Sequence, residues 1–443
     1  MTYSDTIDFL YGIRLFGQKL GLETMQYLLR LMGDPQRSLR FIHIAGTNGK
    51  GSVAAMLHAA LSAAGYHTGL YTSPHLVSFC ERFQINGRPV AESDIVRLVE
   101  DIKPLLAKVG ADPEFRSPTF FEAVTAIALH YFHERKVDVV VWETGLGGRL
   151  DATNVVTPLV SVITNVAFDH TQYLGETLSQ IAVEKCGIIK NGVPVVTAAG
   201  AEEALAVVRR TVAERACRLT VVGEHVRATR LGEDEHCQGV RLDGTRREYG
   251  ALTIPLLGPH QALNCATAVA ALEASGLDVA PAQVGEGLGR TRWPGRFEIV
   301  GHDPTVVLDG AHNAAASEKL ALTLREHFAG RKLTLIIGVL RDKNYDQMCS
   351  ILAPLAGRIF CVPVNSERTS DPDQLARWCK AANPAAHVSV DPNVSEAYPR
   401  ARAAGGGSVI VITGSLFLVG EALDRLGFAH APTATTPKEL VLQ

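Results

Sequence analysis

The chain has 443 residues, of which 47% are hydrophobic and 20% are charged, values that exclude an intrinsically disordered or collagen-like protein. This length predicts two or three domains, with cores that need no disulfide bonds for stability. Lys and Arg total 43 and Asp and Glu total 46, for a net charge of -3, which argues against a protein that binds nucleic acid or an anionic membrane through its overall charge.

From residue 40 onward, short apolar runs rich in β-branched residues alternate with longer helical patterns. In the first part of the chain the predicted strands are 40–46, 137–145, 159–164 and 193–198, and the predicted helices are 51–65, closed by Gly65, and 119–135. This alternation predicts an α/β fold with a doubly wound, mostly parallel sheet.

The pattern changes after residue 200. Segments between 205 and 256 are shorter, more polar and interrupted by glycines, and they predict a small antiparallel patch on the first domain. After a predicted helix at 260–275, the aperiodic stretch 290–300 is rich in Arg, Pro and Gly and is the candidate interdomain linker. Predicted strands at 305–310, 333–339, 358–364 and 408–413 then indicate a smaller α/β domain, and the polar tail from Pro432 is expected to fray.

The eight cysteines are scattered, without a Cys-x-x-Cys pair or a zinc-ribbon spacing, so we expect free thiols in a reducing compartment. The first residues include Asp5 and Asp8 and no continuous apolar segment, so we expect no signal peptide. No run of about 18 apolar residues occurs, so we expect no membrane span. These features predict a cytoplasmic, soluble protein.

The strongest local motif lies between the first predicted strand and the first predicted helix. Glycines in such a loop let backbone N–H groups turn inward, and the N-terminus of the following helix adds partial positive charge, so the loop favours phosphate. Lys50 would bring a cation to the β- and γ-phosphates and Ser52 a hydroxyl toward magnesium, although Gly51 separates the two, unlike in the strict P-loop pattern. The alternative is a glycine-rich turn with an exposed lysine. The predicted phosphate-binding residues are Gly46, Thr47, Asn48, Gly49, Lys50, Gly51 and Ser52.

Ten short motifs follow one another along nearly the whole chain, in the order in which one protein family has them. They are HIAGTNGKGS (43–52), TSPHLVSFCERFQING (72–87), TFFEAVTAIAL (119–129), ETGLGGRLDATN (143–154), ITNVAFDHTQYLG (163–175), EKCGIIK (184–190), GPHQALNCATA (258–268), WPGRFE (293–298), LDGAHN (308–313) and TGSLFLVGE (413–421). With these motifs the chain resembles the bacterial folylpolyglutamate synthase / dihydrofolate synthase family of the Mur ligase superfamily. One departure is Ala314, where the family usually has proline.

The resemblance implies an ATP-dependent acid–amino-acid ligase. Such an enzyme adds L-glutamate to dihydropteroate and to tetrahydrofolate or folylpolyglutamate: ATP phosphorylates a carboxylate to an acyl phosphate, and the amine of glutamate displaces phosphate. Phosphoryl transfer needs positioned cations more than covalent help from the protein. The implied partners are small molecules, and the resemblance suggests a monomer.

The resemblance also implies two magnesium ions. Ser73 and Glu143 match positions that contact one ion, together with Ser52, and His170 matches a position that contacts the second. By residue type alone, we would interpret Ser73, which precedes Pro74, as a turn residue and His170 as a hydrogen-bonded structural histidine. Glu143 closes an apolar strand, where a carboxylate is costly without a cation.

Lys185 matches a lysine that carbon dioxide carbamylates in the family, which turns a cation into an anion suited to a magnesium site. Such a lysine needs a lowered pKa, which burial near other cations supplies. With Lys50 and His170, Lys185 completes the implied catalytic set, whereas Lys190 falls outside the motif position. The alternative for Lys185 is a solvated helix lysine.

The predicted second domain would complete the nucleotide and glutamate sites. Asn264, Arg296 and Asp309 match positions that contact ATP, and His312 and Ser415 match positions near the incoming glutamate. Without the surrounding motifs, we would interpret Arg296 as an ordinary charged residue of the linker and Asp309 as part of an ordinary turn.

The pterin-bearing substrate should meet aromatic and apolar groups, since its ring is flat. The positions that match the family's pteroate-contacting stretches are Gly21, Leu22, Glu23, Phe120, Phe121 and Glu122. Core packing by Phe120 or Phe121 in the helix predicted at 119–135 is the alternative.

Together these observations predict a P-loop-type, doubly wound ATP-binding domain at 1–295, followed by a smaller Rossmann-like glutamate-ligase domain at 296–443. A monofunctional folylpolyglutamate synthase or another Mur-type ligase is an alternative, although the phosphate loop begins at residue 46 and leaves too little chain for the extra N-terminal domain of cell-wall members. A P-loop ATPase or switch without ligase chemistry would give His312 and Ser415 no role. A further alternative is a non-catalytic metal-binding scaffold, which would give the phosphate loop no function.

Overall fold

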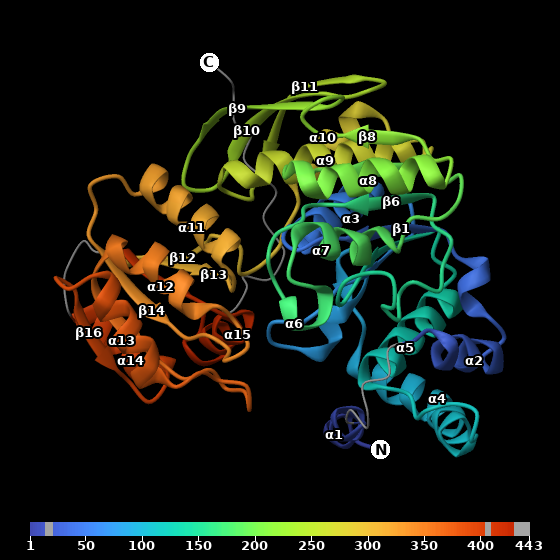
Figure 1. The fold of residues 1–443 in the computed structure, drawn as a ribbon, viewed down its shortest axis with the longest axis horizontal. Helices are drawn as coiled ribbons and strands as arrows, with labels where there is room; N and C mark the ends of the chain where they lie inside the picture. Colours follow the sequence, from blue (N-terminus) through green and yellow to red (C-terminus); the bar gives the residue numbers. More distant parts are fainter. Residues whose placement is uncertain (14–20, 404–408, 429–443) are drawn as a thin grey trace.

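The computed structural model describes residues 1–13, 21–403 and 409–428. Figure 1 shows two bodies side by side: a larger one drawn in blue to yellow, and a smaller one drawn in orange to red. Each body is built around its own mostly parallel sheet, as the sequence predicted for an α/β chain. The predicted fraying tail from Pro432 lies outside the described residues. Among the helices in the described ranges, none is long and apolar enough to cross a membrane.

Within the described residues the larger sheet has eight strands in the order β4-β3-β2-β5-β1-β6-β7-β8. Neighbours from β2 to β8 are parallel, and β3 and β4 add an antiparallel edge. The strands predicted at 40–46, 137–145, 159–164 and 193–198 are confirmed as β1, β5, β6 and β7. The strands are β1 (Phe41–Ala45), β2 (Thr68–Tyr71), β3 (Phe83–Ile85), β4 (Arg88–Pro89), β5 (Val139–Glu143), β6 (Val160–Ile163), β7 (Val195–Thr197) and β8 (Leu219–Val221).

Helices cover both faces of this sheet because its strands are apolar on both sides. Along β5, Val139 and Val141 pack in the core beneath α3 and α9, whereas Val140 and Trp142 pack in the core beneath α4 and α5. The helices predicted at 51–65, 119–135 and 260–275 are confirmed as α3, α5 and α9. The helices of this part are α1 (Tyr3–Gly12), α2 (Glu23–Leu31), η1 (Pro35–Ser38), α3 (Lys50–Ala63), η2 (Phe79–Arg82), α4 (Glu92–Ala111), α5 (Phe120–Glu134), α6 (Thr171–Leu174), α7 (Leu178–Cys186), α8 (Glu202–Glu214), α9 (Pro259–Ser275) and α10 (Pro281–Gly289).

The antiparallel patch predicted over 205–256 is correct for its second half and wrong for its first. Strands β9 (Arg227–Glu233), β10 (Gln238–Asp243) and β11 (Glu248–Ile254) form an antiparallel sheet over α9 and α10. Residues 202–221 instead form α8 and β8, and β8 pairs in parallel with β7. Helix α8 buries Leu205, Val208 and Val212 on one face, and its charged opposite face gave the segment its polar composition.

The smaller sheet has six strands within the described ranges, in the order β12-β13-β17-β14-β15-β16, and only β12 is antiparallel to its neighbour. The four strands predicted for this part are confirmed as β13, β14, β15 and β17. Its strands are β12 (Glu298–His302), β13 (Thr305–Asp309), β14 (Leu333–Ile337), β15 (Ala356–Cys361), β16 (His387–Val390) and β17 (Val409–Thr413). Its helices are α11 (Ala314–His327), α12 (Tyr345–Leu352), η3 (Ala353–Leu355), α13 (Pro372–Ala382), α14 (Val394–Ala403) and α15 (Leu416–Arg425).

The predicted linker 290–300 is too long by three residues. Glu298 and Ile299 pair with Leu308 and Val307 of β13, so the irregular connection between α10 and β12 is 290–297. A strand of five residues that contains a glycine carries too little alternation to be recognised without its partner. The departure at Ala314 falls on the first residue of α11, a position that accepts either proline or alanine.

All eight cysteines lie in the described part of the chain as free thiols, and six of them are buried. Buried free thiols of this kind act as small apolar side chains in the core.

Helix α10 packs against α3 through a glycine, and this contact predicts a difference between two alanine substitutions. A Cβ at Gly287 would lie 2.6 Å from the carbonyl oxygen of Ala59, whereas a Cβ at Gly285 would meet only the Leu252 side chain at 3.5 Å. We expect Gly287→Ala to lower the free energy of unfolding by about 1–3 kcal/mol, because backbone cannot yield as a side chain can. Gly285→Ala, in the same helix, should be neutral or stabilising by up to about 1 kcal/mol. Urea unfolding of both variants is the measurement, and equal effects would contradict the close packing of α10 on α3.

Candidate functional site

A cavity of about 280 Å³ lies where the carboxyl ends of four neighbouring strands of the larger sheet face the smaller body. Ser73 follows β2, Glu143 ends β5, the loop from Gly46 follows β1, and Thr164 follows β6, and all four places line the cavity. This is the edge of a doubly wound sheet at which ligands bind. The opposite wall comes from the end of β13, the first turns of α11 and the start of α15.

The phosphate loop lines the cavity, and hydrogen bonds from the segment after β6 hold it in place. The Asn48 N–H donates to Asn165 Oδ1 (2.7 Å), and the Thr164 hydroxyl donates to the Asn48 carbonyl oxygen (2.7 Å). Gly49 has φ +83°, and a Cβ there would lie 2.6 Å from Asn264 Oδ1, so this position requires glycine for both backbone and space. Helix α3 begins at Lys50, whose Nζ donates to the Gly46 carbonyl oxygen (3.1 Å). The first turn of α3 lines the cavity, and the partial positive charge of a helix N-terminus favours an anion there.

Glu143 and Ser73 lie together beside this loop. The Ser73 N–H donates to Glu143 Oε2 (3.1 Å), and Glu143 is only 4% exposed. Burial raises the pKa of the Glu143 carboxyl, and the positive charges of Lys50 and Arg296 act against that rise. The hydroxyl-bearing residues Ser52 and Ser73 line the same cavity as this carboxylate, so the oxygen donors that a hard cation prefers are gathered at one place.

Lys185 is buried in α7 and also lines the cavity, so the alternative of a solvated helix lysine is wrong. Burial, followed by the nearby charge of Lys50, lowers the pKa of Lys185 to about 7. A large part of its amine is therefore uncharged near neutral pH. Lys190 lies elsewhere, with its Nζ donating to Asn154 Oδ1 (2.8 Å).

His170 also lines the cavity, next to a cluster of residues that was not predicted from the sequence. Lys343, from the loop after β14, places Nζ 2.6 Å from Asp169 Oδ1 and 3.2 Å from His170 Nε2. Asn313 Nδ2 donates to Asp169 Oδ2 (3.0 Å) and to Asn48 Oδ1 (3.1 Å), which ties α11 to the phosphate loop. These contacts join the two bodies directly at the cavity.

Burial and the neighbouring charges shift the pKa values of Asp169 and His170. Burial works to raise the pKa of Asp169, but the charges of Lys343, His170 and His312 outweigh it, and the pKa lies well below its usual value. Burial also lowers the pKa of His170 to about 4, so its imidazole is neutral at physiological pH and offers a lone pair. Asp169 and Asn313 stand in the motifs FDHTQYLG and LDGAHN, which could have pointed to them, whereas Lys343 stands outside all ten motifs.

The residues predicted to contact ATP all line the cavity. Asn264, on α9, donates from Nδ2 to Gln261 Oε1 (2.9 Å). Asp309, at the end of β13, accepts the N–H groups of Phe297 (2.9 Å) and Ala311 (2.8 Å), so its carboxylate shapes the loop around it. Burial raises the pKa of Asp309, and the neighbouring Arg296 acts against that rise. The guanidinium of Arg296 is thus neither an isolated linker charge nor far from the phosphate loop.

The two predicted glutamate-side residues differ in placement. His312 lines the cavity, with Nδ1 2.8 Å from the Gly310 carbonyl oxygen and Nε2 3.7 Å from Asp169 Oδ2. Ser415 is buried as the N-cap of α15, where its hydroxyl accepts the Phe417 N–H (3.1 Å). The lining of the cavity includes its neighbour Leu416 but not Ser415.

The predicted pteroate-contacting residues lie outside the cavity lining. Both carboxylate oxygens of the buried Glu122 accept from Arg116 (2.6 and 2.7 Å), and Glu122 also closes the capping box of α5 with Thr119. Glu122 is therefore occupied in holding the start of α5. Gly21 accepts from Arg116 through its carbonyl oxygen (3.4 Å), next to Leu22, the N-cap of α2, and Glu23, its first residue.

Phe120 and Phe121 stand at the start of α5, half-buried against the core. A Cβ on Gly145, which lines the cavity, would lie 2.5 Å from the ring of Phe121. Phe120 stacks on Tyr11 with centroids 5.3 Å apart, and the guanidinium of Arg82 lies 5.7 Å from the centre of its ring. We call Tyr11, Phe120 and Arg82 the aromatic shelf. Arg82 stands in the motif TSPHLVSFCERFQING, which could have pointed to it, but its contact with Phe120 joins residues far apart in the chain.

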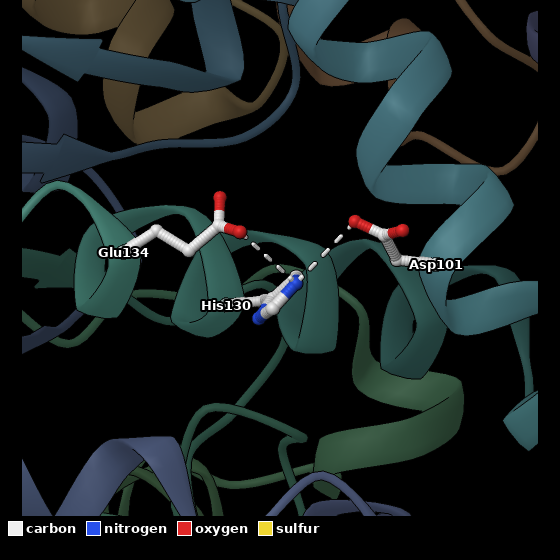
Figure 2. Close-up of side chains that lie close together, drawn as sticks. All are labelled: Asp101, His130 and Glu134. Carbon is white, nitrogen blue, oxygen red and sulfur yellow. Dashed lines mark ion pairs between the residues drawn. The ribbon is translucent and has the colours of Figure 1, made fainter.

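One group of metal-ligand types lies elsewhere, between α4 and α5 (Figure 2). His130 Nε2 is 3.7 Å from Asp101 Oδ2 and 3.6 Å from Glu134 Oε1. The same two oxygens accept from Arg97 Nη1, at 3.2 and 3.0 Å. The guanidinium already supplies the positive charge that a metal would bring, so this group is an ion-pair network that joins two helices.

Comparison with known families and proteins agrees with the geometry. The sequence model of the family described as Mur ligase middle domain matches residues 44–272, and that of the Mur ligase glutamate ligase domain matches residues 295–416. A dihydrofolate synthase/folylpolyglutamate synthase of Bacillus subtilis (strain 168) is 36% identical over 431 residues, which cover 96% of this chain and 99% of that protein.

Solved structures give the same result. The folylpolyglutamate synthase of Mycobacterium tuberculosis, complexed with ADP and AMPPCP, has a TM-score of 0.90 at 32% identity and covers 97% of this chain and 100% of that one. The Escherichia coli FolC protein in complex with DHPP and ADP has a TM-score of 0.85 at 29% identity and covers 97% of this chain and 99% of that one. Sequence and fold therefore agree over almost the whole length, and the chain belongs to the Mur ligase family of ATP-dependent ligases, among the dihydrofolate synthase/folylpolyglutamate synthase proteins.

Proposed function

We propose that this chain is an ATP-dependent amide ligase that adds L-glutamate to dihydropteroate and to tetrahydrofolate or its polyglutamates. The observation that carries this proposal is the single cavity in which the phosphate loop and Glu143 of the larger sheet face Arg296 and His312 of the smaller body. One wall has the form of a phosphate site, and the opposite wall adds cationic and imidazole groups. A bound nucleotide and an acid thus meet between two bodies, away from bulk water.

The reaction has two steps that these residues can support. The acid's carboxylate oxygen attacks the γ-phosphorus of ATP, the bond to the β-phosphate oxygen breaks, and ADP and an acyl phosphate form. The amine of glutamate then attacks the acyl carbon and loses a proton, and phosphate leaves. Lys50 and Arg296 would hold the phosphate charges in both steps, since positioned cations supply most of the catalysis in phosphoryl transfer.

The residues present suit magnesium at the phosphate loop. A buried carboxylate at Glu143 is costly without a cation, and the hydroxyls of Ser52 and Ser73 are further hard oxygen donors at the same place. We propose that these three residues hold one ion and that the neutral imidazole of His170 helps to hold a second. Magnesium, when bound, would neutralise phosphate charge. The neighbouring Asp169 lies 3.7 Å from His312 Nε2, so its carboxylate faces the smaller body.

We propose that Lys185 is carbamylated and so serves the second ion as an anion. Support comes from its burial beside Lys50 and from its lowered pKa, because the uncharged amine is the form that reacts with carbon dioxide. An unmodified ammonium would add a further positive charge beside Lys50, which the carbamate would remove.

For the acid substrate we propose the region from Gly145 to the aromatic shelf. Phe121 packs against Gly145 at the edge of the cavity, and Phe120 is part of the shelf, where a flat ring could stack. Residues 21–23 adjoin this region through Arg116. His312 faces the opposite side, where we propose that the incoming glutamate binds, with Ser415 fixing the start of α15 nearby.

We further propose that residues 1–295 and 296–443 are the two domains. Separate sheets and separate hydrophobic cores support this division, as do the two family matches, which end at 272 and begin at 295. Since one chain supplies both walls of the cavity, we propose that it acts as a monomer.

ADP release from the purified protein tests the function and separates it from its alternatives. We expect release that needs both glutamate and an acid, with dihydropteroate and with tetrahydrofolate. Release with tetrahydrofolate alone would identify a monofunctional folylpolyglutamate synthase. Release independent of glutamate would instead identify a P-loop ATPase and overturn the proposal.

Lys50→Ala should reduce ligation by about 100-fold or more while the fold survives, because the ammonium acts on phosphate charge that develops during transfer. Its loss removes contacts only to loop carbonyl oxygens, so the stability change should stay within about 1 kcal/mol. Turnover and thermal melting without ligand are the measurements. A large loss of stability would show a structural lysine instead.

Glu143→Gln should lower activity steeply and raise the magnesium concentration needed for half-maximal activity by about tenfold or more, because a neutral amide binds the cation poorly. The amide oxygen can still accept the Ser73 N–H, so the local backbone contact is kept. Activity measured across a magnesium titration checks this. An unchanged titration curve would remove Glu143 from the metal site.

Lys185→Ala should be nearly inactive, and Lys185→Arg should not restore activity, because a guanidinium stays positive and cannot be carbamylated. A short acid such as acetate should partly restore the alanine variant by filling the vacated space. Lys190→Arg is the matched control in the same segment and should retain activity, since Lys190 bonds to Asn154 and lies outside the cavity lining. The measurement is turnover at saturating ATP, magnesium and glutamate. Near-normal turnover of Lys185→Arg would refute the carbamate.

A further inference from the structure

Lys343 makes a contact between the two bodies that the proposed reaction does not use. It stands just before α12, yet its ammonium reaches Asp169 Oδ1 (2.6 Å) and His170 Nε2 (3.2 Å), which follow β6 in the larger body. The side chains of Lys343 and Asp169 are 7% and 8% exposed, so water screens this ion pair little. Asn313 donates to the other carboxylate oxygen of Asp169 (3.0 Å) and so keeps the group in place.

The chemistry of the two partners of Lys343 decides what this contact means. An ammonium has only donors, so in this pair His170 Nε2 must be the acceptor and use its lone pair. A divalent cation bound by His170 Nε2 would need the same lone pair. Asp169 Oδ1, the second partner of Lys343, is likewise an oxygen that a divalent cation would attract. One position beside His170 thus has room for the ammonium or for a metal ion, but not for both.

We propose that Lys343 is an interdomain latch that occupies the position of a divalent cation at His170 and Asp169, so that a metal ion bound there and the Lys343 contact exclude each other. This inference rests on the proposed function, because it uses His170 as a metal-binding residue. Its consequence is a link between metal loading and the placement of the smaller body. A cation that binds at His170 displaces Lys343 and breaks a contact between the two bodies, and loss of the cation lets the latch reform.

A simpler interpretation is that Lys343 and Asp169 form a structural ion pair and nothing more. The two interpretations differ in what removal of the ammonium does to metal binding. A structural pair predicts weaker packing between the bodies and no gain in metal affinity. The latch predicts a gain, because the cation no longer competes with an ammonium for the lone pair of His170.

The test is a titration of the full chain with Mn²⁺ without nucleotide or substrate, followed by the electron paramagnetic resonance signal of the free ion. Lys343→Met should bind Mn²⁺ about tenfold more tightly than the wild type, the effect of removing a competing charged hydrogen bond. Lys343→Arg keeps a donor-only cation and should retain the wild-type affinity. The gain should disappear in Lys343→Met combined with His170→Ala, which places it at His170 rather than at Glu143.

Lys319→Met is the matched control, because Lys319 also lines the cavity from the smaller body. It removes the same charge and should leave Mn²⁺ affinity within about twofold of the wild type. If Lys343→Met proves too unstable to titrate, Lys343→Gln removes the charge and keeps a donor for Asp169, and the same gain is expected. Equal affinity in wild type and both neutral variants would overturn the latch, as would an equal gain in Lys319→Met. ADP release is measured separately, so a ligase that shows no gain in Mn²⁺ affinity would refute the latch and leave the function standing.

Discussion

Charged side chains with little exposure meet in and beside the cavity between the two sheets, and the rest of the site depends on how their charges balance. Glu143 and Lys185 come from the larger body, and Asp309 and Lys343 come from the smaller one. A buried charge is costly unless an opposite charge or a ligand compensates it. The raised pKa of Glu143 and the lowered pKa of Lys185 reflect this cost, since burial is the leading cause of both shifts. A site of this kind is prepared for a ligand that carries several charges of its own, as a nucleotide with its metal ions does.

The cavity exists only while the two bodies stay together, and contacts of different kinds hold them. Gly420 of α15 lies against the carbonyl oxygen of Leu76 so closely that no Cβ would fit there. Arg230 of β9 pairs with Glu326 of α11 at 2.9 Å, which connects the antiparallel sheet to the smaller body. Close backbone approach fixes the distance between the bodies, whereas ion pairs can exchange partners. The contacts at Asp169 are of the second kind.

Residues close in sequence explain most of what could be predicted about the site. The run from β1 through Gly49 to α3 is one continuous segment, so its strand, loop and helix are evident from the order of its residues. Glu143 could be placed because a carboxylate at the end of an apolar strand is unusual, and strand ends meet at one edge of a parallel sheet. Lys343 could not, since its partner Asp169 lies far along the chain and Lys343 stands outside every motif. The importance of Glu122 for α5 was also hidden, because it depends on Arg116 and on the capping geometry together.

Local sequence pattern was enough to predict the α/β alternation, the phosphate loop and the family, and it predicted an antiparallel segment over 205–256, of which 227–254 is confirmed. Each depends on local periodicity, turn chemistry or ordered motifs, which are properties of neighbouring residues. Long-range contacts were needed to show that 202–221 forms α8 and β8, that β12 begins inside the expected linker, and that the walls of the cavity come from both bodies. Strand β8 is defined by its pairing with β7, and β12 by its pairing with β13. The role of the Lys343 charge depends on its direct contacts with Asp169 and His170, which belong to the other body. Strand pairing and burial between distant segments are long-range effects, so the local sequence pattern cannot predict them.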